Sequence, residues 1–270
     1  MLSSRRSNYI SASILVVTLA VVSVVLWSLN KGMIFSDEAF YLFHNNPDLH
    51  AIRVTNWHIL YAPFIFQNHV LSKLVLVVFK IATAFTFGYL GAILLKIRLS
   101  PLATGCLIVI SQFILTYPIG FTPSYFSINS IVINLVFICL MLFLIREEKI
   151  WLFLLGFFLA SLPFLMYTNA MAAIPIILYL SFFQSKNQII KVLLSIFTGA
   201  MLLLLLYFTL LESPQDFLKN FREAIVYLDH ISSHGSSVIY NWNANIVRDF
   251  SLSFIFLATP SFMCDTFAKP

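Results

Sequence analysis

Apolar stretches of about 20 residues recur along this chain, and they constrain its fold more than any other feature. A helix needs about 20 apolar residues to cross the roughly 30 Å hydrocarbon layer of a membrane. Lipid offers no partner for backbone polar groups, so a spanning segment must satisfy them within a helix or a closed barrel. Of the 270 residues, 60% are hydrophobic and only 10% are charged, whereas a soluble domain has about 25% charged residues. The sequence therefore predicts an all-α, polytopic transmembrane helical bundle.

One apolar stretch, residues 150–183, is too long for a single span. Its 34 residues would extend about 51 Å as a helix. Pro163 and Pro175 flank the polar tetrapeptide Tyr167–Ala170, which suits a tight turn, so we divide the stretch into two spans. About eight spans are then expected, at Ile10–Leu29, Leu74–Leu95, Leu102–Ile119, Ile128–Ile145, 150–166, 170–183, Ile189–Leu211 and from Phe250 to about Met263.

Basic residues test this count. Four pairs of them fall in short connections or termini on one side of the expected spans, and the positive-inside rule makes that side cytoplasmic. An undivided helix over residues 150–183 would place the last pair outside. The first apolar run is longer than that of a signal peptide and no cleavage site follows it, so we expect it to stay attached as a span. With the basic pairs on the cytoplasmic side, the N-terminus is expected to be cytoplasmic. The expected location is the inner membrane of a bacterium. The pairs are Arg5 and Arg6, Lys96 and Arg98, Arg146 and Lys149, and Lys186 and Lys191.

Two long segments then face outward from a single membrane domain that comprises residues 1–270. They are residues 30–69 and 212–249, and they contain all six histidines and eight of the 11 acidic residues. The second segment predicts an amphipathic helix from about Pro214 to His230, because its apolar residues recur at helical spacing. The polar chemistry of the chain is thus expected at one face of the membrane.

The first external segment contains the sequence SDEAFYLFH at residues 36–44. Ser36 suits a helix N-cap, and Asp37 and Glu38 would lie in the first turn, where the helix dipole favours negative charge. A second aromatic run at Leu60–Phe66 would help to hold this interfacial helix at the membrane surface. The simpler alternative is a surface helix whose acids only balance the dipole.

Lys73 and Lys80 are two helical turns apart on the next span, so they share a face. Lys80 would lie about 10 Å below the outer end of that span. Ionisable groups at such depth are costly and mark a pathway or a bound partner; alternatively, the lysine stems extend back to the interface. Cations beneath surface carboxylates suit a lipid-linked phosphosugar. The cations would neutralise the phosphate leaving group while a carboxylate acts as general base on the acceptor.

The order of these features resembles the N-terminal part of the GT-C membrane glycosyltransferases, the group of the protein O-mannosyltransferases and the bacterial aminoarabinose transferase. Asp37-Glu38 with Tyr41 matches in residue type, order and distance from the first span, and Trp151–Leu180 is similar to a pair of short spans in those enzymes. The resemblance implies that Asp37 is the catalytic base and Glu38 its neighbour. It also implies a polyprenyl-phosphate sugar as donor, and transfer to a glycan, lipid or protein acceptor outside the membrane.

The chain departs from that family at three points. Met166 replaces the basic residue that usually precedes the Tyr-Thr pair at Tyr167, and Gly120–Ser130 contains no acidic residue. The chain ends near its eighth expected span, whereas members of the family are usually longer. A truncated or inactive member is therefore one expectation.

Substrate binding is assigned to Lys80, Lys73, Tyr41, Arg53 and His58. No cofactor is firmly implied, although a divalent cation would be compatible. The histidine spacing matches no metal site, and no motif indicates nucleic-acid binding.

Two other functions stay open. A polysaccharide polymerase or ligase would use the same lipid-linked donor. A transporter or channel with no catalytic activity would instead line a polar path with amide and lysine side chains inside the spans. Its candidate residues are Lys80, Gln112, Asn129, Asn134 and Asn169.

Overall fold

The computed structural model describes most of the apolar part of the chain and shows no strand within it. The described residues up to Phe217 form one compact unit, and the few beyond it belong to a second unit that starts at Leu218. The described residues are 2–29, 69–116, 125–165, 173–183, 186–210, 212–219 and 222.

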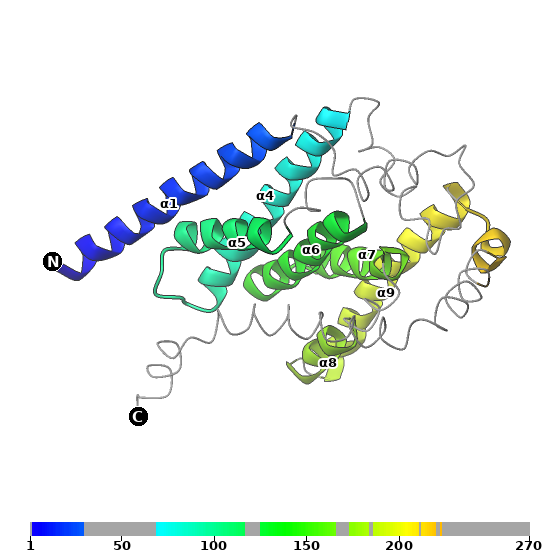
Figure 1. The fold of residues 1–270 in the computed structure, drawn as a ribbon. Coiled ribbons are helices and arrows are strands. Elements are labelled where there is room, and N and C mark those ends of the chain that lie inside the picture. The colour runs from blue at the N-terminus through cyan, green and yellow to red at the C-terminus, as the bar shows by residue number, and fades with distance from the viewer. Residues whose placement is uncertain are drawn as a thin grey trace, which may run out of the picture. The chain divides into compact units, whose positions relative to one another are not determined.

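Seven helices of 11 to 27 residues account for most of these ranges (Figure 1). They overlap seven of the eight apolar stretches expected as spans, although the first helix begins eight residues before Ile10 and the second five before Leu74. The eighth stretch, from Phe250, lies outside the described residues, as does the expected interfacial helix after Ser36. The helices are α1 (Leu2–Ser28), α4 (His69–Leu94), α5 (Pro101–Thr116), α6 (Tyr125–Arg146), α7 (Lys149–Leu165), α8 (Ala173–Phe183) and α9 (Lys186–Leu210).

Four of the described helices are long and apolar enough to cross a membrane, which identifies an integral membrane protein. α5 and α7 are apolar but shorter, and α8 has only 11 residues. The four candidate spans are Tyr9–Ser28, Val70–Leu94, Ser127–Arg146 and Gln188–Leu210.

α4 and α5 are antiparallel and approach closely through glycine. Lys80 lies beside Phe113 near one end of the contact, and Gly88 lies beside Gly105 near the other. A methyl group on Gly88 would come within 2.9 Å of the Gly105 Cα atom. Small residues let helix backbones come together in lipid, where no hydrophobic force drives apolar helices together.

α6 runs parallel to α4, because residue numbers rise together along their contact. Asn134 bonds to Thr83, and Met141 lies against Gly91 two turns further on. α7 then returns antiparallel to α6, since only residues 147–148 join the two packed helices.

α1 packs on α5 and runs parallel to it. The hydroxyl oxygens of Ser11 and Ser100 lie 3.1 Å apart at the start of this contact. Val25, near the far end of α1, shares a buried cluster with Phe113, near the far end of α5. Most other apolar side chains of α1 are exposed, as expected for a helix whose outer face contacts lipid.

α7 and α9 cross with their backbones in contact. A methyl group on Gly156 would run into the carbonyl oxygen of Ile196, and one on Gly199 into that of Phe153. Two turns beyond Gly156 on α7, the ring of Phe164 lies against Tyr207. Numbers rise together along this contact, so α7 and α9 are parallel.

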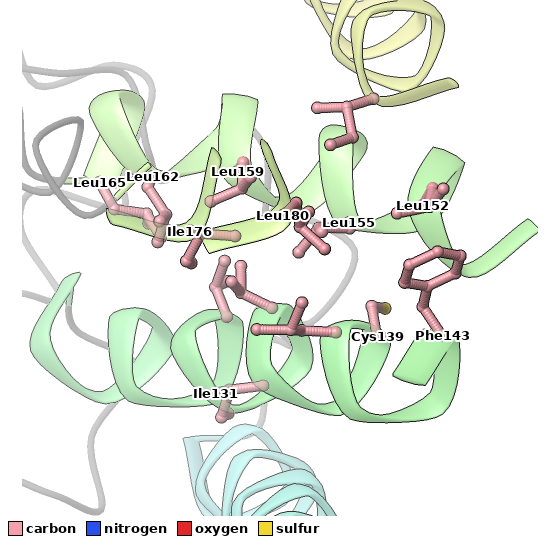
Figure 2. Close-up of a cluster of buried hydrophobic side chains, with 14 of the residues drawn as sticks. Ile131, Cys139, Phe143, Leu152, Leu155, Leu159, Leu162, Leu165, Ile176 and Leu180 are labelled. Atoms are coloured by element: carbon pink, nitrogen blue, oxygen red, sulfur yellow. The ribbon is translucent and has the colours of Figure 1, made fainter. Parts of the chain in front are cut away.

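α8 is a separate helix between α7 and α9, as predicted. The expected turn at Tyr167–Ala170 lies outside the described residues, and Pro163 lies within α7, which continues to Leu165. Ile176 and Leu180 of α8 belong to the same buried cluster as Leu155 and Leu162 of α7 (Figure 2). One continuous helix would carry Leu180 about 37 Å beyond Leu155, so it could not bring both into this cluster. The parallel course of α7 and α9 requires the same reversal.

These directions bring several basic connections to one end of the bundle, called here the basic end. The C-terminal ends of α4 and α6 lie there with the N-terminal ends of α1, α5, α7 and α9. The opposite end holds Leu29, His69 and Leu210, so it is the end at which residues 30–68 join the bundle. The exposed basic side chains of the basic end are Lys96, Arg98, Arg146, Lys149 and Lys191.

The helix ends there are closed by left-handed residues. Lys96 has a φ of 50° and Glu147 a φ of 56°. After α4, the amide of Lys96 donates to Ile93 and that of Ile97 to Ala92, a bonding pattern that satisfies the last carbonyls of a helix.

A short helix over residues 214–219 begins where the sequence predicted, at Pro214. The Ser213 hydroxyl accepts a bond from the amide of Asp216 at 3.1 Å and donates to its carboxylate at 2.6 Å. Ser213 is thus the N-cap, and proline is favoured directly after a cap. The expected continuation to His230 lies outside the described residues.

The close contact of α7 and α9 at their glycines predicts that Gly→Ala lowers stability there, whereas Gly→Ala at Gly91 raises it. At Gly91 the nearest atom to an added methyl group is the Met141 sulfur at 3.8 Å, so Gly91→Ala should gain up to about 1 kcal/mol of helix stability. Gly156→Ala and Gly199→Ala should instead cost about 1–3 kcal/mol through overpacking. Thermal unfolding in one detergent measures both. Equal midpoints for the three variants would contradict the crossing.

Candidate functional site

Lys73 and Lys80 both face the interior of the protein from α4. Lys80 is 0% exposed and Lys73 is 7% exposed, whereas Val78 and Phe79 on the same helix are exposed. The prediction that the two lysines share a face is confirmed. Because neighbouring helices bury them, neither lysine side chain lies on a lipid-facing surface.

Lys80 lies above an aromatic ring of α5. Its ammonium nitrogen is 5.7 Å from the centroid of the Phe113 ring, within the range at which the negative face of a ring attracts a cation. Val77 and Ala84, which flank Lys80 on α4, are fully buried with Phe113 in one apolar cluster. The ammonium is therefore held in a largely apolar contact between α4 and α5.

Three polar side chains form a layer one turn from Lys80, on α4, α5 and α6. The amides of Gln112 and Asn134 bond reciprocally: Gln112 Nε2 donates to Asn134 Oδ1 at 3.2 Å, and Asn134 Nδ2 lies 3.4 Å from Gln112 Oε1. Asn134 Nδ2 also lies 3.4 Å from the hydroxyl oxygen of Thr83. Asn134 is thus the common member of the layer, and it is only 3% exposed.

Thr83 is the member of this layer nearest to Lys80 in the sequence. It lies three residues after Lys80, on the same side of α4. Its hydroxyl donates to the carbonyl oxygen of Phe79 at 2.9 Å and approaches that of Lys80 at 3.3 Å, the local bonding by which threonine is accommodated inside a helix. Hydrogen bonds between membrane helices contribute about 0.6 kcal/mol each on average, so the layer also fastens the three helices together.

The end of the bundle that joins residues 30–68 also contains an aromatic cluster. Phe164 of α7 and Tyr207 of α9 have ring centroids 4.2 Å apart, and Phe217 packs on both. The buried Tyr207 hydroxyl donates to Glu212 Oε2 at 2.5 Å. These contacts fold residues 212–217 against α7 and α9.

The remaining assigned site residues lie outside the described part of the chain. They are the catalytic pair Asp37 and Glu38 and the substrate-binding residues Tyr41, Arg53 and His58. Within the described ranges, no three His, Cys, Asp or Glu side chains gather to hold a metal ion.

Sequence reasoning did not identify two members of the site, Thr83 and Phe113. The spacing of Thr83 from Lys80 was a signal that could have revealed it. Phe113 gives no such signal, because its position over the ammonium depends on how α5 packs against α4. The sequence had indicated Lys80, Gln112 and Asn134 together only as candidates to line the polar path of a transporter or channel.

The described geometry defines a cationic site inside the helix bundle: a buried lysine, an aromatic ring and a polar layer, in the half of α4 nearest its N-terminal end. A buried cation of this kind can bind an anionic group that enters from that end. No known protein family, curated protein or solved structure matches this chain.

The hydrogen-bonded amides of Gln112 and Asn134 give a prediction about stability. Replacing Asn134 alone with leucine should destabilise the protein more than replacing both residues with leucine. Asn134→Leu should lower the free energy of unfolding by about 0.6–1.7 kcal/mol, because it removes bonds to both α4 and α5. Replacing both partners with similarly sized apolar groups is close to neutral, so Gln112→Leu/Asn134→Leu should recover much of that loss. Unfolding in a mild detergent provides the comparison. Additive losses in the double variant would show that the pair does not interact.

Proposed function

We propose that this protein is a multi-pass membrane glycosyltransferase. It would transfer a sugar from a polyprenyl-phosphate-linked donor to a glycan, lipid or protein acceptor outside a bacterial cytoplasmic membrane. The observation on which the proposal depends is the burial of Lys73 and Lys80 in α4, in the half of the helix nearest to residues 30–68. Charged side chains inside a membrane bundle are retained for function.

In the proposed topology eight spans cross the membrane and the basic end is cytoplasmic. The packing directions support this arrangement independently of the sequence count, since they gather the connections after α4 and α6 with the start of α9. Basic residues in short connections remain on the cytoplasmic side. Residues 30–68 and the segment after α9 would then face outward.

The depth of the two lysines fits the chemical form of the donor. A polyprenyl phosphate places its anionic group near headgroup depth and its tail in the hydrocarbon. Lys73 lies four residues after the start of α4 and Lys80 eleven, which corresponds to about 6 and 16 Å along the helix. Lys73 is thus suited to contact the phosphate first, and Lys80 attracts it further into the bundle.

The reaction would proceed by direct displacement. The acceptor hydroxyl or amine attacks the anomeric carbon of the sugar, and the new glycosidic bond forms as the bond from that carbon to the phosphate oxygen breaks. The bonding electron pair leaves with the phosphate, whose charge the lysines stabilise. The acceptor proton passes to the carboxylate of Asp37 as general base, beside Glu38. Tyr41, Arg53 and His58 would position the substrates.

A second function, a transporter or channel, is favoured by one observation. Gln112 and Asn134 bond to each other inside the bundle, and Asn134 bonds to Thr83 one turn from Lys80, as a polar path would require. The two functions differ in which residues matter. A transporter would lose flux on disruption of the polar layer and retain it in Asp37→Asn, whereas the enzyme would lose transfer in Asp37→Asn first.

The proposed topology makes residue 187 cytoplasmic. With the native cysteines replaced by alanine, Asn187→Cys should react with a membrane-impermeant maleimide in inverted vesicles and stay unlabelled in intact cells. Ser213→Cys, beyond the far end of α9, is the control and should show the reverse pattern. Labelling of Asn187→Cys in intact cells would overturn the orientation.

The proposed lysine site predicts that replacing the buried Lys80 weakens donor binding, whereas replacing an exposed lysine at the basic end does not. Hydrogen bonds to charged groups contribute about 1.5–3 kcal/mol, so Lys80→Met should weaken binding of a polyprenyl-phosphate sugar by roughly 10- to 100-fold. Lys191→Met removes an exposed lysine at the basic end and is the matched control. Titration of the detergent-solubilised protein with donor measures both; an unchanged donor affinity in Lys80→Met would remove this lysine from the site.

Asp37→Asn tests the catalytic assignment separately. The amide keeps the size of the carboxylate but cannot accept the proton, so transfer should fall by about 100-fold or more while donor affinity stays near that of the native chain. Full transfer by a correctly inserted Asp37→Asn protein would refute the role of this residue.

A further inference from the structure

We propose that the basic end of the bundle is a binding surface for anionic phospholipid headgroups. The inference depends on the membrane-spanning fold and is independent of sugar transfer. It concerns the side of the protein away from Lys73 and Lys80, where exposed cations lie beside helices with lipid-facing apolar surfaces. Its central residues are Lys96, Arg146 and Lys149.

The helix packing places these cations at one level. Gly91 lies against Met141, and the same separation of 50 residues puts Lys96 of the α4 end level with Arg146 of the α6 end. Only two residues separate Arg146 from Lys149, the first residue of α7. The three basic side chains thus come from the ends of three neighbouring helices.

Two more cations extend the surface. Arg98 follows Lys96 by two residues in the same connection. Because Gly156 lies at Ile196 and Phe164 at Tyr207, the parallel register of α7 and α9 places Lys191 within about a turn of the level of Lys149. Basic side chains from consecutive connections therefore surround this end of the bundle.

Two acidic residues lie among the cations without cancelling them. Glu147 and Glu148 form the connection between α6 and α7. Besides Arg98, four exposed basic side chains among the described residues accompany these two acidic ones: Lys96, Arg146, Lys149 and Lys191. One carboxylate oxygen of Glu148 accepts a bond from the indole nitrogen of Trp151 at 3.0 Å. An anionic headgroup would meet this positive surplus of the described side chains.

Trp151 places this surface at the membrane interface. Its indole is half-buried in the first turn of α7 and its polar edge bonds to Glu148, the position that tryptophan prefers between headgroups and acyl chains. Lys149 lies two residues away. An anionic lipid that pairs with Lys149 and Arg146 would therefore bring its acyl chains within reach of the Trp151 ring.

The test uses Trp151 as a native reporter. A protein with Trp27→Phe, Trp57→Phe and Trp242→Phe keeps Trp151 alone and is reconstituted in mixtures of phosphatidylcholine and phosphatidylglycerol, with either lipid brominated on its acyl chains. Quenching by each brominated lipid gives their relative binding near Trp151. We expect phosphatidylglycerol to bind several-fold more strongly, since each basic side chain near a surface contributes about fivefold, and the preference should weaken at high salt.

Matched variants separate charge from folding. Arg146→Gln/Lys149→Gln should abolish most of the preference, whereas Arg146→Lys/Lys149→Arg should retain it. Lys219→Gln/Arg222→Gln removes two exposed positive charges that follow α9 in the sequence and should leave it unchanged. A protein that keeps Trp27 alone, at the opposite end of α1, should show no dependence on Arg146 and Lys149.

Two results would overturn the proposal. One is equal quenching of Trp151 by the two brominated lipids at low salt. The other is a preference for phosphatidylglycerol that survives Arg146→Gln/Lys149→Gln. A loss of sugar transfer without a change in lipid preference would count against the proposed enzyme and leave this surface intact.

Discussion

The bundle depends on two places where helix backbones touch, α7 against α9 at Gly156 and Gly199, and α4 against α5 at Gly88 and Gly105. In lipid the apolar side chains of one helix gain little by leaving hydrocarbon for those of another, so close van der Waals contact between backbones replaces the hydrophobic force that folds soluble domains. Each glycine contact also fixes a register. The α4–α5 contact sets where Phe113 meets Lys80, and the α7–α9 contact sets the parallel course that requires α8 to reverse the chain.

Register in turn connects packing to chemistry. Once α4 is placed against α5 and α6, Lys80 has no route to a lipid-facing surface, and its ammonium must be stabilised within the protein. Thr83, Gln112 and Asn134 add polar groups at nearly the same depth and join all three helices. The bundle thus separates two kinds of cation. Lys73 and Lys80 are buried in the N-terminal half of α4, and the exposed basic side chains described for the bundle lie at the opposite end.

The helices were predictable from the sequence because length and apolarity suffice to define a span. The division of residues 150–183 into two helices was also correct, and Pro175 and the basic pair near Lys186 were independent signals for it, whereas Pro163 lies within α7. The candidate site was harder to predict from the sequence. Spacing showed that Lys73 and Lys80 share a face, but the pairing of Gln112 with Asn134 and the position of Phe113 arise from contacts between helices, which a hydropathy pattern does not encode. For Asp37 and Glu38 the assignment depends on local sequence and family resemblance alone.

The shortness of α8 has a consequence for how the protein is made. With 11 residues it extends about 16 Å, roughly half the hydrocarbon thickness, so during synthesis it is a poor candidate to leave the translocon for lipid unaided. α9 follows after only two residues and is more than twice as long. If α8 enters the membrane, it would therefore do so as one hairpin with the longer α9. Its insertion would then depend on the synthesis of α9.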